Sequence, residues 1–281
     1  MMTKTVFIIG NKRSGSTQLV RLMNLHPNVF MSQESDIIWI LYRFHNNLEI
    51  VPYQWDTQVG MNHTLEKYAH LLSRDKTPLE NFVTIQTNLM KDGFQSIQPL
   101  HKENLLWIGD KKPFQQIDPE IVPFIKEHFP NSKFIHLIRH PFAAVKSSKV
   151  FKAGELWKGT SEEDILKLWT LHESRVQLEK DKNEVPMLDV RYEDIISQTR
   201  TSMAKLFDFL ELKYDKQILL EARKITRSTI RKHPRLNCPP ETEAIMSQYG
   251  YKTKSFWLEN PLYVNAFNGL KKLKRKITGT W

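Results

Sequence analysis

The fold is decided by a stretch near the start of the sequence, Thr5-Val6-Phe7-Ile8-Ile9-Gly10-Asn11-Lys12-Arg13-Ser14-Gly15-Ser16-Thr17. Its first five residues are mostly apolar and β-rich, and they predict a buried strand over 5–9. A glycine- and serine-containing loop follows, and residues 16–25 predict a helix that His26-Pro27 ends. A strand, such a loop and a helix in this order are typical of an α/β domain that binds an oxyanion at the helix N-terminus.

The rest of the sequence continues the alternation of strands and helices. Short apolar runs predict strands at 29–31, 105–108, 133–138 and 185–190, and helical patterns fall at 118–128, 141–151, 161–181 and 199–211. Continuous apolar strands separated by helices indicate a parallel sheet covered on both faces. We therefore expect a P-loop-type, three-layer α/β/α fold that forms one domain over residues 1–281. Residues 45–100 are predicted to be a helical insertion on the acceptor side.

Composition restricts the class of protein. The chain has 281 residues and a net charge of +10, which favours anionic ligands without choosing among them. The single cysteine, Cys238, excludes an intrachain disulfide and a cysteine zinc site. No run approaches the roughly 18 apolar residues that a membrane-spanning helix needs. We expect a cytoplasmic monomer or homodimer that binds neither membranes nor nucleic acid.

The loop departs from the nucleotide-binding pattern G-x-x-x-x-G-K-[ST] at one position. Gly10, Gly15 and Thr17 match the pattern, but Ser16 replaces the lysine that reaches the β- and γ-phosphates of ATP. A donor with a shorter anionic chain therefore fits better than ATP. A kinase would also need a strand that ends in a metal-binding Asp. Asp110, after the strand predicted at 105–108, comes closest to that position. A kinase, and a turn that binds no ligand, stay open as alternatives.

The same loop resembles the 5′-phosphosulfate loop of the sulfotransferases that use 3′-phosphoadenosine-5′-phosphosulfate (PAPS) and release 3′-phosphoadenosine-5′-phosphate (PAP). In that family a Pro and a Lys or Arg precede Ser-Gly-Thr-Thr. The resemblance implies that Arg13 contacts the transferring sulfonate, and Lys12 replaces the usual proline. It implies cofactor contacts for Lys12, Arg13, Ser14, Gly15, Ser16 and Thr17.

A second segment, which runs from Phe134 to Pro141 and on to Ser147, resembles the 3′-phosphate site of this family. Arg139 ends the predicted strand, and Pro141 suits the first turn of the next helix. Ser147 lies about two helical turns further on and is able to face back toward the same phosphate. The resemblance implies that Arg139 and Ser147 hold the 3′-phosphate, with His140 in place of the usual Asp.

Three more segments match the family pattern. Arg191-Tyr192-Glu193-Asp194 implies that Tyr192 contacts the adenine of the cofactor, although a buried core tyrosine also fits. Gly109-Asp110-Lys111-Lys112-Pro113 implies that Lys111 is catalytic, with Lys112 in place of a small polar residue. A late basic loop offers candidates for the 3′-phosphate and the bridging oxygen, although a solvated loop fits as well: Ser228, Arg231 and Lys232.

Sulfuryl transfer also requires a base that removes the proton of the acceptor. Glu34 follows the strand predicted at 29–31 and should emerge at the sheet edge that presents the loop. Protein-tyrosine and bacterial sulfotransferases place a catalytic Glu at a similar distance, so the resemblance favours Glu34. Two alternatives stay open: residues 34–36 only cap the next helix, or His101 is the base, as in relatives that act on small phenols.

The sequence thus predicts an enzyme that moves a sulfuryl group in line from PAPS to a hydroxyl, amine or carbamoyl group of a small molecule. No metal is expected, because a monoanionic sulfonate needs less charge neutralisation than a phosphoryl group. The resemblance favours a secondary metabolite, for example an alkaloid toxin, as the acceptor. The alternatives are a P-loop kinase of a small molecule and a nucleotide-binding module without activity.

Overall fold

The computed structural model describes residues 4–54, 58–149, 159–226 and 236–253. Their contacts divide the chain into two compact units. Unit 1 consists of Met1–Gly10, Ser16–His136 and Arg175–Leu188, and unit 2 consists of Asn11–Gly15, Leu137–Ser174 and Asp189–Trp281. The five-residue segment between β1 and α1 therefore belongs to unit 2, while the elements on both sides of it belong to unit 1.

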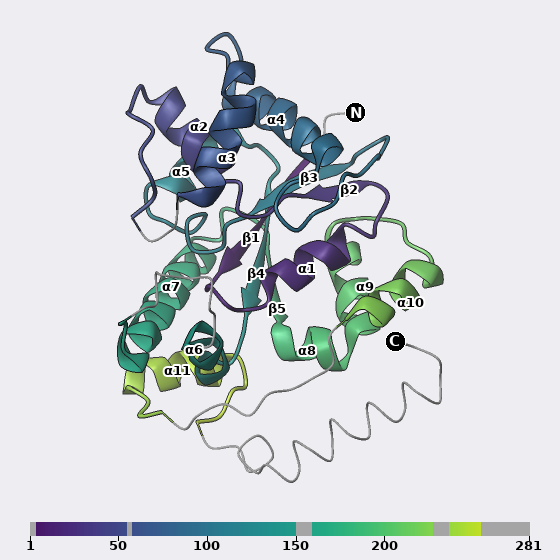
Figure 1. The fold of residues 1–281 in the computed structure, drawn as a ribbon. Helices are drawn as coiled ribbons and strands as arrows, with labels where there is room; N and C mark the ends of the chain where they lie inside the picture. Colours follow the sequence, from purple (N-terminus) through teal and green to yellow (C-terminus); the bar gives the residue numbers. More distant parts are fainter. Residues whose placement is uncertain (1–3, 55–57, 150–158, 227–235, 254–281) are drawn as a thin grey trace. The chain divides into compact units, whose positions relative to one another are not determined.

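Five strands form one parallel sheet in the order β2-β3-β1-β4-β5 (Figure 1). They are β1 (Lys4–Gly10), β2 (Val29–Met31), β3 (Trp107–Lys111), β4 (Lys133–Ile138) and β5 (Met187–Arg191). In the register of the sheet, Gly109 of β3 lies opposite Val6 of β1 and Met31 of β2. The predicted α/β fold with a parallel sheet and flanking helices is confirmed.

Unit 1 contains most of the helices in the first half of the chain. These are α1 (Ser16–Met23), α2 (Ile37–His45), α3 (Val59–Tyr68), the 3-10 helix η1 (Ala69–Leu71), α4 (Pro78–Asp92) and α5 (Ile121–His128). Helix α2 packs against α3, α4 and α5, and α1 packs on β2 and β3. Residues 45–100 thus hold α3, η1 and α4, and their role on the acceptor side stays a prediction.

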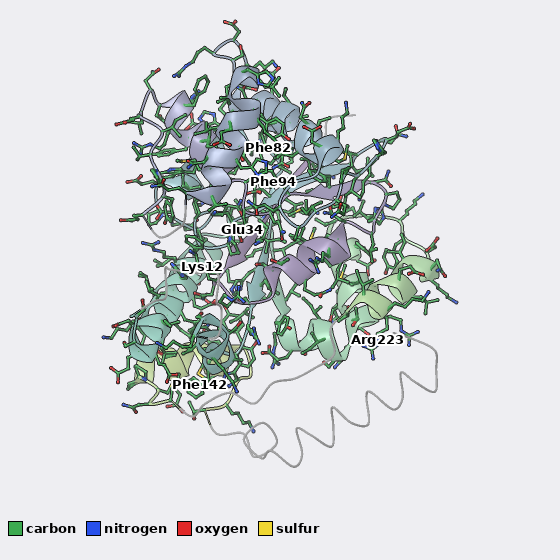
Figure 2. The ribbon with its side chains drawn as sticks, in the orientation of Figure 1. Lys12, Glu34, Phe82, Phe94, Phe142 and Arg223 are labelled. Carbon is green, nitrogen blue, oxygen red and sulfur yellow. The ribbon has the colours of Figure 1, made fainter. Side chains whose placement is uncertain are left out.

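An aromatic cluster forms the core of unit 1. Phe7 of β1 lies with its ring centroid 5.9 Å from that of Phe82 on α4 and 5.6 Å from that of Phe129, after α5. Phe82 and Phe129 also meet edge to face, with ring centroids 5.3 Å apart. All three side chains are buried, and Figure 2 labels Phe82. Edge-to-face packing of this kind fixes the helices on the sheet and so holds the strand ends in place.

Unit 2 is built from helices that follow β4 and β5. They are α6 (Pro141–Lys149), the first part of α7 (Glu162–Lys182), α8 (Tyr192–Ser197), α9 (Thr199–Phe209), α10 (Lys216–Ile225) and α11 (Pro240–Gln248). Ala144 of α6, Trp169 of α7 and Met246 of α11 share one buried apolar cluster. Phe142, labelled in Figure 2, belongs to a second cluster together with Ile165.

Several predicted boundaries are wrong by up to three residues, and two elements differ most. The strand expected at 105–108 spans Trp107–Lys111, and the helix expected at 118–128 begins only at Ile121. The strand extends through Gly109, Asp110 and Lys111 because side chains distant in sequence satisfy the two charged residues, as described below. At Gly109 a Cβ atom would lie 2.1 Å from the Val6 carbonyl oxygen, so only glycine fits between the neighbouring strands.

A partly buried lysine fastens the connection between α1 and β2. The Lys102 ammonium donates hydrogen bonds to the carbonyl oxygens of Asn24, His26 and Val29, at 2.6, 2.9 and 2.6 Å. Burial lowers the pKa of Lys102 to about 8, so the side chain is still mostly charged at pH 7. Because β2 leads directly to Glu34, this clamp also supports the candidate active site.

We expect Lys102→Met to lower the free energy of unfolding by about 2–3 kcal/mol, since three carbonyls lose a charged donor. Chemical denaturation followed by circular dichroism measures the change. The control is Lys91→Met, which removes an exposed lysine of α4. Equal stability of the two variants would contradict a clamping role for Lys102.

Candidate active site

The loop of unit 2 has the backbone shape of an anion-binding turn. Arg13 and Gly15 both have positive φ, at 64° and 91°, a conformation found in turns whose successive amide groups bind an anion. The Ser14 hydroxyl is fully buried and has no hydrogen-bond partner among the described residues. A buried hydroxyl without a partner is costly in a native protein, so this atom suits a ligand that supplies an oxygen.

The start of the loop is fastened to α7. The Asn11 amide donates to Glu173 Oε1 at 2.6 Å and to the Trp169 carbonyl at 3.2 Å. His172 Nδ1 lies 2.9 Å from Asn11 Oδ1. All three of these polar side chains are buried, so the loop is held by side chains that only the fold brings together. Lys12, labelled in Figure 2, lines a small depression beside them with Ser148.

Two arginines predicted to bind the cofactor lie next to each other in unit 2. Arg139 Nη1 donates to the Arg13 carbonyl at 2.8 Å, and Arg13 Nε donates to Ser147 Oγ at 3.3 Å. The Arg139 guanidinium lies 4.5 Å from the centre of the Tyr192 ring. A Cβ atom on Gly15 would lie 2.3 Å from that same ring. The loop, Arg139, Ser147 and Tyr192 therefore form one cluster.

Ser147 and its neighbour Ser148 have different environments. Ser147 is partly exposed and contacts Arg13, whereas Ser148 is buried and donates to the Ala144 carbonyl within α6. The choice of Ser147 as the predicted ligand residue is consistent with this geometry. Two guanidinium groups, the Ser147 hydroxyl and the buried Ser14 Oγ suit a nucleotide with two separate anionic groups, because Arg binds phosphate and sulfonate oxygens bidentately.

The predicted base and the predicted catalytic lysine meet in unit 1. Glu34 follows β2 and has φ 55°, and its carboxylate Oε1 accepts a hydrogen bond from Lys111 Nζ at the end of β3. Glu34 Oε2 lies 3.3 Å from the Nζ of Lys112. The Glu34 side chain is 42% exposed, whereas each lysine is only 2% exposed. Glu34 is thus a reachable carboxylate fixed by two buried ammonium groups.

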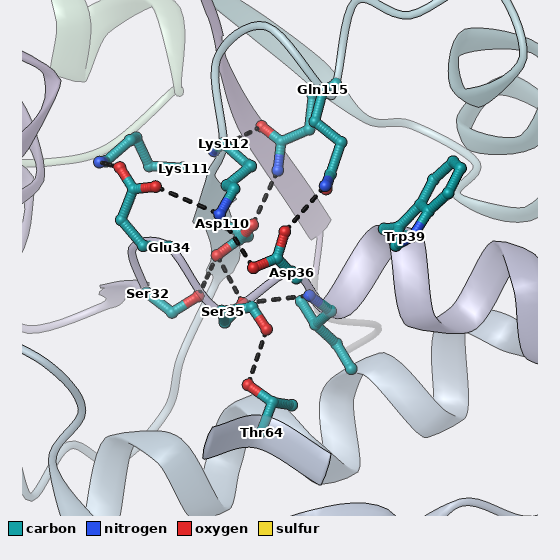
Figure 3. A network of polar contacts seen from close by, with 12 residues as sticks. Ser32, Glu34, Ser35, Asp36, Trp39, Thr64, Asp110, Lys111, Lys112 and Gln115 are labelled. Carbon is teal, nitrogen blue, oxygen red and sulfur yellow. Dashed lines mark hydrogen bonds and ion pairs between the residues drawn. The ribbon is translucent and has the colours of Figure 1, made fainter. Parts of the chain in front are cut away.

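A buried polar network lies beneath these side chains (Figure 3). Asp110 accepts hydrogen bonds from Ser32 and Ser35 at 2.5 and 2.8 Å, and from Gln116 at 2.8 Å. Burial raises the pKa of Asp110, while the two serine hydroxyls oppose that effect. Protein donors already occupy both carboxylate oxygens, so Asp110 has the role of a structural anchor rather than that of the metal-binding Asp of a kinase.

Asp36 is the residue before α2, yet it does not act as a side-chain cap there. Its backbone has φ 54°, and no cap hydrogen bond from its side chain is present in the described helix. The carboxylate instead accepts from Lys112 Nζ at 2.9 Å and from Gln115 Nε2 at 2.8 Å. The capping alternative for residues 34–36 therefore fails for Asp36.

Several predicted residues lie elsewhere or outside the described residues. Ser16 and Thr17 begin α1 in unit 1, and Ser16 is buried. His101 is exposed and precedes the Lys102 clamp. Ser228, Arg231 and Lys232 lie outside the described residues, as does the basic segment after 253. The binding and catalytic roles of all these residues stay predictions.

A known protein family has a sequence pattern that matches the segments described above. A family model described as the sulfotransferase family matches residues 5–216, which include β1, the loop, Glu34, Arg139 and Tyr192. The chain belongs to the sulfotransferase family. Membership of this family implies PAPS as the sulfuryl donor.

Related sulfotransferases are distant in sequence. Protein-tyrosine sulfotransferase A of Caenorhabditis elegans is 22% identical over 218 residues, which are 76% of this chain and 51% of that protein. The chain thus spans about half the length of this curated relative. The solved sulfotransferase domain from the curacin biosynthetic pathway has a TM-score of 0.57 and 17% identity, over 89% of this chain and 99% of that chain. The domain from the Synechococcus PCC 7002 olefin synthase has a TM-score of 0.55 and 20% identity, over 89% and 96%. These two structures establish the fold.

The described part of the sulfotransferase has neither a membrane-spanning helix nor a metal cluster. No helix there is long and apolar enough to cross a bilayer. No group of three His, Cys, Asp or Glu side chains among the same residues is arranged to hold a metal ion.

The sequence did not point to Asn11, Asp36 or Lys112 as site residues. A signal existed only for Lys112, which replaces a small polar residue of the family pattern. Asn11 and Asp36 meet their partners across 162 and 76 positions of sequence, so no local pattern reveals them.

We expect Arg139→Ala to weaken PAP binding by about 1.5–3 kcal/mol, roughly tenfold to a hundredfold, through loss of a charge-assisted contact. Isothermal titration calorimetry measures the affinity, and Arg200→Ala, at an exposed position of α9, is the control. If a folded Arg139→Ala variant binds PAP as tightly as the control, Arg139 does not contact the cofactor.

Proposed function

We propose that this sulfotransferase moves a sulfuryl group from PAPS to a hydroxyl, amine or carbamoyl group of a small molecule by in-line transfer. The observation that carries the proposal is the cluster of Arg13, Arg139 and Ser147 beside the buried Ser14 hydroxyl. This cluster offers contacts for two anionic groups, and the loop beside it lacks the lysine of ATP-binding loops.

The residues of the loop and its neighbours would hold the cofactor. Ser14 Oγ and the amides of the loop would bind the 5′-phosphosulfate end, while Arg139 and Ser147 would bind the 3′-phosphate. Tyr192 would limit the position of both groups, because its ring lies close to Gly15 and to the Arg139 guanidinium. When bound, PAPS supplies the sulfuryl group and a phosphate leaving group.

Glu34 and Lys111 supply the acid–base and electrostatic parts of the mechanism. The Glu34 carboxylate accepts the proton of the acceptor as the acceptor atom attacks. With PAPS bound, the buried Lys111 ammonium would balance negative charge on the sulfonate and the bridging oxygen, as is proposed for Arg13. Lys111 holds Glu34 in one orientation before the reaction, so neither group has to reorganise during transfer.

The proposal includes the chemical class of the acceptor, which is a small molecule. The name of one similar structure refers to a biosynthetic pathway, which supports a secondary metabolite as the acceptor. An alkaloid toxin is one example that we propose to include in the acceptor panel. The curated relative is named for protein tyrosine, which supports a phenolic hydroxyl as the reacting group. Helices α3 and α4 of the 45–100 segment are proposed to contact the acceptor.

A transfer assay with [³⁵S]PAPS tests the function. The protein is incubated with panels of phenols, aliphatic alcohols, amines, carbamoylated compounds and a tyrosine peptide, without added magnesium. Label should appear in a small-molecule product, with release of PAP. Transfer of label from [γ-³²P]ATP to the same panel, with PAPS left intact, would instead identify a kinase.

A further inference from the structure

A buried ion pair lies directly behind Glu34. Lys112 Nζ lies 2.9 Å from Asp36 Oδ2 and 3.3 Å from Glu34 Oε2, so one ammonium bridges two carboxylates. The Lys112 and Asp36 side chains are only 2% and 3% exposed. Gln115 donates to the second oxygen of Asp36, at 2.8 Å. Lys112 is therefore held by a buried carboxylate, both oxygens of which accept from buried donors, and it reaches Glu34 from that position (Figure 3).

The turn that carries Glu34 is clamped by α3. At Gly60, near the start of α3, a Cβ atom would lie 1.9 Å from the Glu34 carbonyl oxygen and 2.7 Å from Asp36 Oδ2. Thr64 of the same helix donates to the Ser35 carbonyl at 2.6 Å. Residues 34 and 36 both have positive φ, a conformation that is uncommon outside glycine and needs support from its surroundings. The helix and the ion pair together provide that support.

The need for two lysines is not explained by the transfer chemistry alone. Lys111 already contacts Glu34 and balances charge in the proposed mechanism, whereas Lys112 is turned toward the protein interior through Asp36. Lys112 contacts the second oxygen of Glu34, the one that Lys111 does not contact in the ion pair described above. In the proposed mechanism Lys111 also balances charge on the transferring group, so a second ammonium group on Glu34 keeps the base fixed while Lys111 has both tasks.

We propose that Lys112 is a positioning residue: through its ion pair with Asp36 it holds the Glu34 carboxylate ionised and correctly oriented while Lys111 serves the transferring group. This inference rests on the proposed role of Glu34 as the base. Lys112 does not touch the donor or the acceptor and acts only through Glu34.

Charge determines how loss of Lys112 should alter the pH dependence of the reaction. The charged groups around Glu34 within unit 1 are Lys111 and Lys112 from β3 and its end, Asp36 from the turn, and Asp110 from β3. Removing the Lys112 ammonium disfavours the ionised Glu34, since an adjacent cation stabilises a negative charge. Removing the Asp36 carboxylate acts in the opposite direction, but Lys112 lies between the two carboxylates and is the charge nearer to Glu34, so its loss has the larger effect. Protonation of Glu34 would then occur at higher pH, and the acidic limb of the rate profile would move in the same direction.

The test uses Lys112→Met combined with Asp36→Asn, because the double change leaves no lone buried charge. The control is Lys126→Met, since Lys126 also bridges two carboxylates, those of Glu179 and Glu184, at 2.5 and 2.6 Å. The third variant is Glu34→Gln, alone and added to the double change. Circular dichroism establishes that each variant is folded.

Two readouts are needed. Single-turnover consumption of [³⁵S]PAPS is followed against pH, with p-nitrophenol or water as acceptor. The titration of the Glu34 carboxyl is followed by ¹³C NMR without any cofactor, so this readout does not require activity. PAP affinity is measured in parallel by calorimetry.

We expect the double change to slow PAPS consumption about tenfold to a hundredfold, as misplaced catalytic groups do. PAP affinity should be unchanged, and both the acidic limb and the carboxyl titration should move to higher pH. In the Glu34→Gln background the double change should have no further effect on rate. The control should leave rate and titration as in the unaltered protein.

The experiment distinguishes a wrong role for Lys112 from a wrong choice of Glu34 as the base. If Glu34→Gln slows the reaction but the double change leaves the rate and both pH dependences as they were, Lys112 is not a positioning residue. An equal loss of rate with and without Glu34 would also overturn the inference, because Lys112 would then act independently. If Glu34→Gln itself has no effect, the proposed base is wrong, whatever the NMR titration shows.

Discussion

Gly15→Ala is expected to reduce the affinity for PAP about a hundredfold or more. Gly15 has φ 91°, a conformation that costs an L-residue roughly 1–2 kcal/mol. The added Cβ atom would also lie 2.3 Å from Tyr192 Cδ2, so the ring and the loop must separate. Because the Arg139 guanidinium lies 4.5 Å from the centre of the same ring, one methyl group disturbs both predicted anion sites.

Gly159→Ala is a matched control for the cost of placing alanine at positive φ. Gly159 has φ 84°, but a Cβ atom there would meet nothing within 4 Å. Calorimetry with PAP, together with thermal unfolding of each variant, separates the local collision from general backbone strain. Similar affinity of the two folded variants would contradict the assignment of the loop as the cofactor site.

Glu34→Gln is expected to slow sulfuryl transfer about 10²–10⁴-fold, the usual consequence of losing a general base. The substitution keeps the size of the side chain, so PAP affinity should be unchanged. Single-turnover assays with the acceptor found in the [³⁵S]PAPS screen measure the rate, and Glu66→Gln, at an exposed position of α3, is the control.

The pH dependence distinguishes a lost base from a lost cation. Without Glu34 the rate should rise with pH, because the acceptor must ionise unaided. Lys111→Ala should also be slow but should keep an acidic limb, since its base is still present. If Glu34→Gln turns over at the wild-type rate, another residue is the general base, and His101 would be the next candidate.

The fold was predictable where local sequence and tertiary structure agree. The apolar run of β1 ends at Gly10, and such a run is recognisable without knowledge of its neighbours. The same holds for β4, whose buried residues precede Arg139 and Pro141. The β3 boundary was misplaced because its last residues are polar, and a strand containing Asp110 is stable only once Ser32, Ser35 and Gln116 donate to it.

Of the candidate site, the residues that belong to short motifs could be predicted from the sequence. Arg13, Arg139 and Ser147 belong to short motifs, and the structure brings them into one cluster. The partners that orient Glu34 could not be predicted, because their positions depend on the fold rather than on spacing in the sequence. Lys112 meets an Asp36 that is 76 positions away, and Gly60 is required only because α3 approaches the Glu34 carbonyl.

Titration calorimetry with nucleotides tests the central claim most directly. The protein is titrated in EDTA with PAP and with 5′-AMP, and separately with ATP and magnesium. We expect PAP to bind without magnesium, and 5′-AMP to bind at least about tenfold more weakly because it lacks the 3′-phosphate that Arg139 is proposed to hold. Tight binding of ATP with magnesium, together with no binding of PAP, would contradict the account.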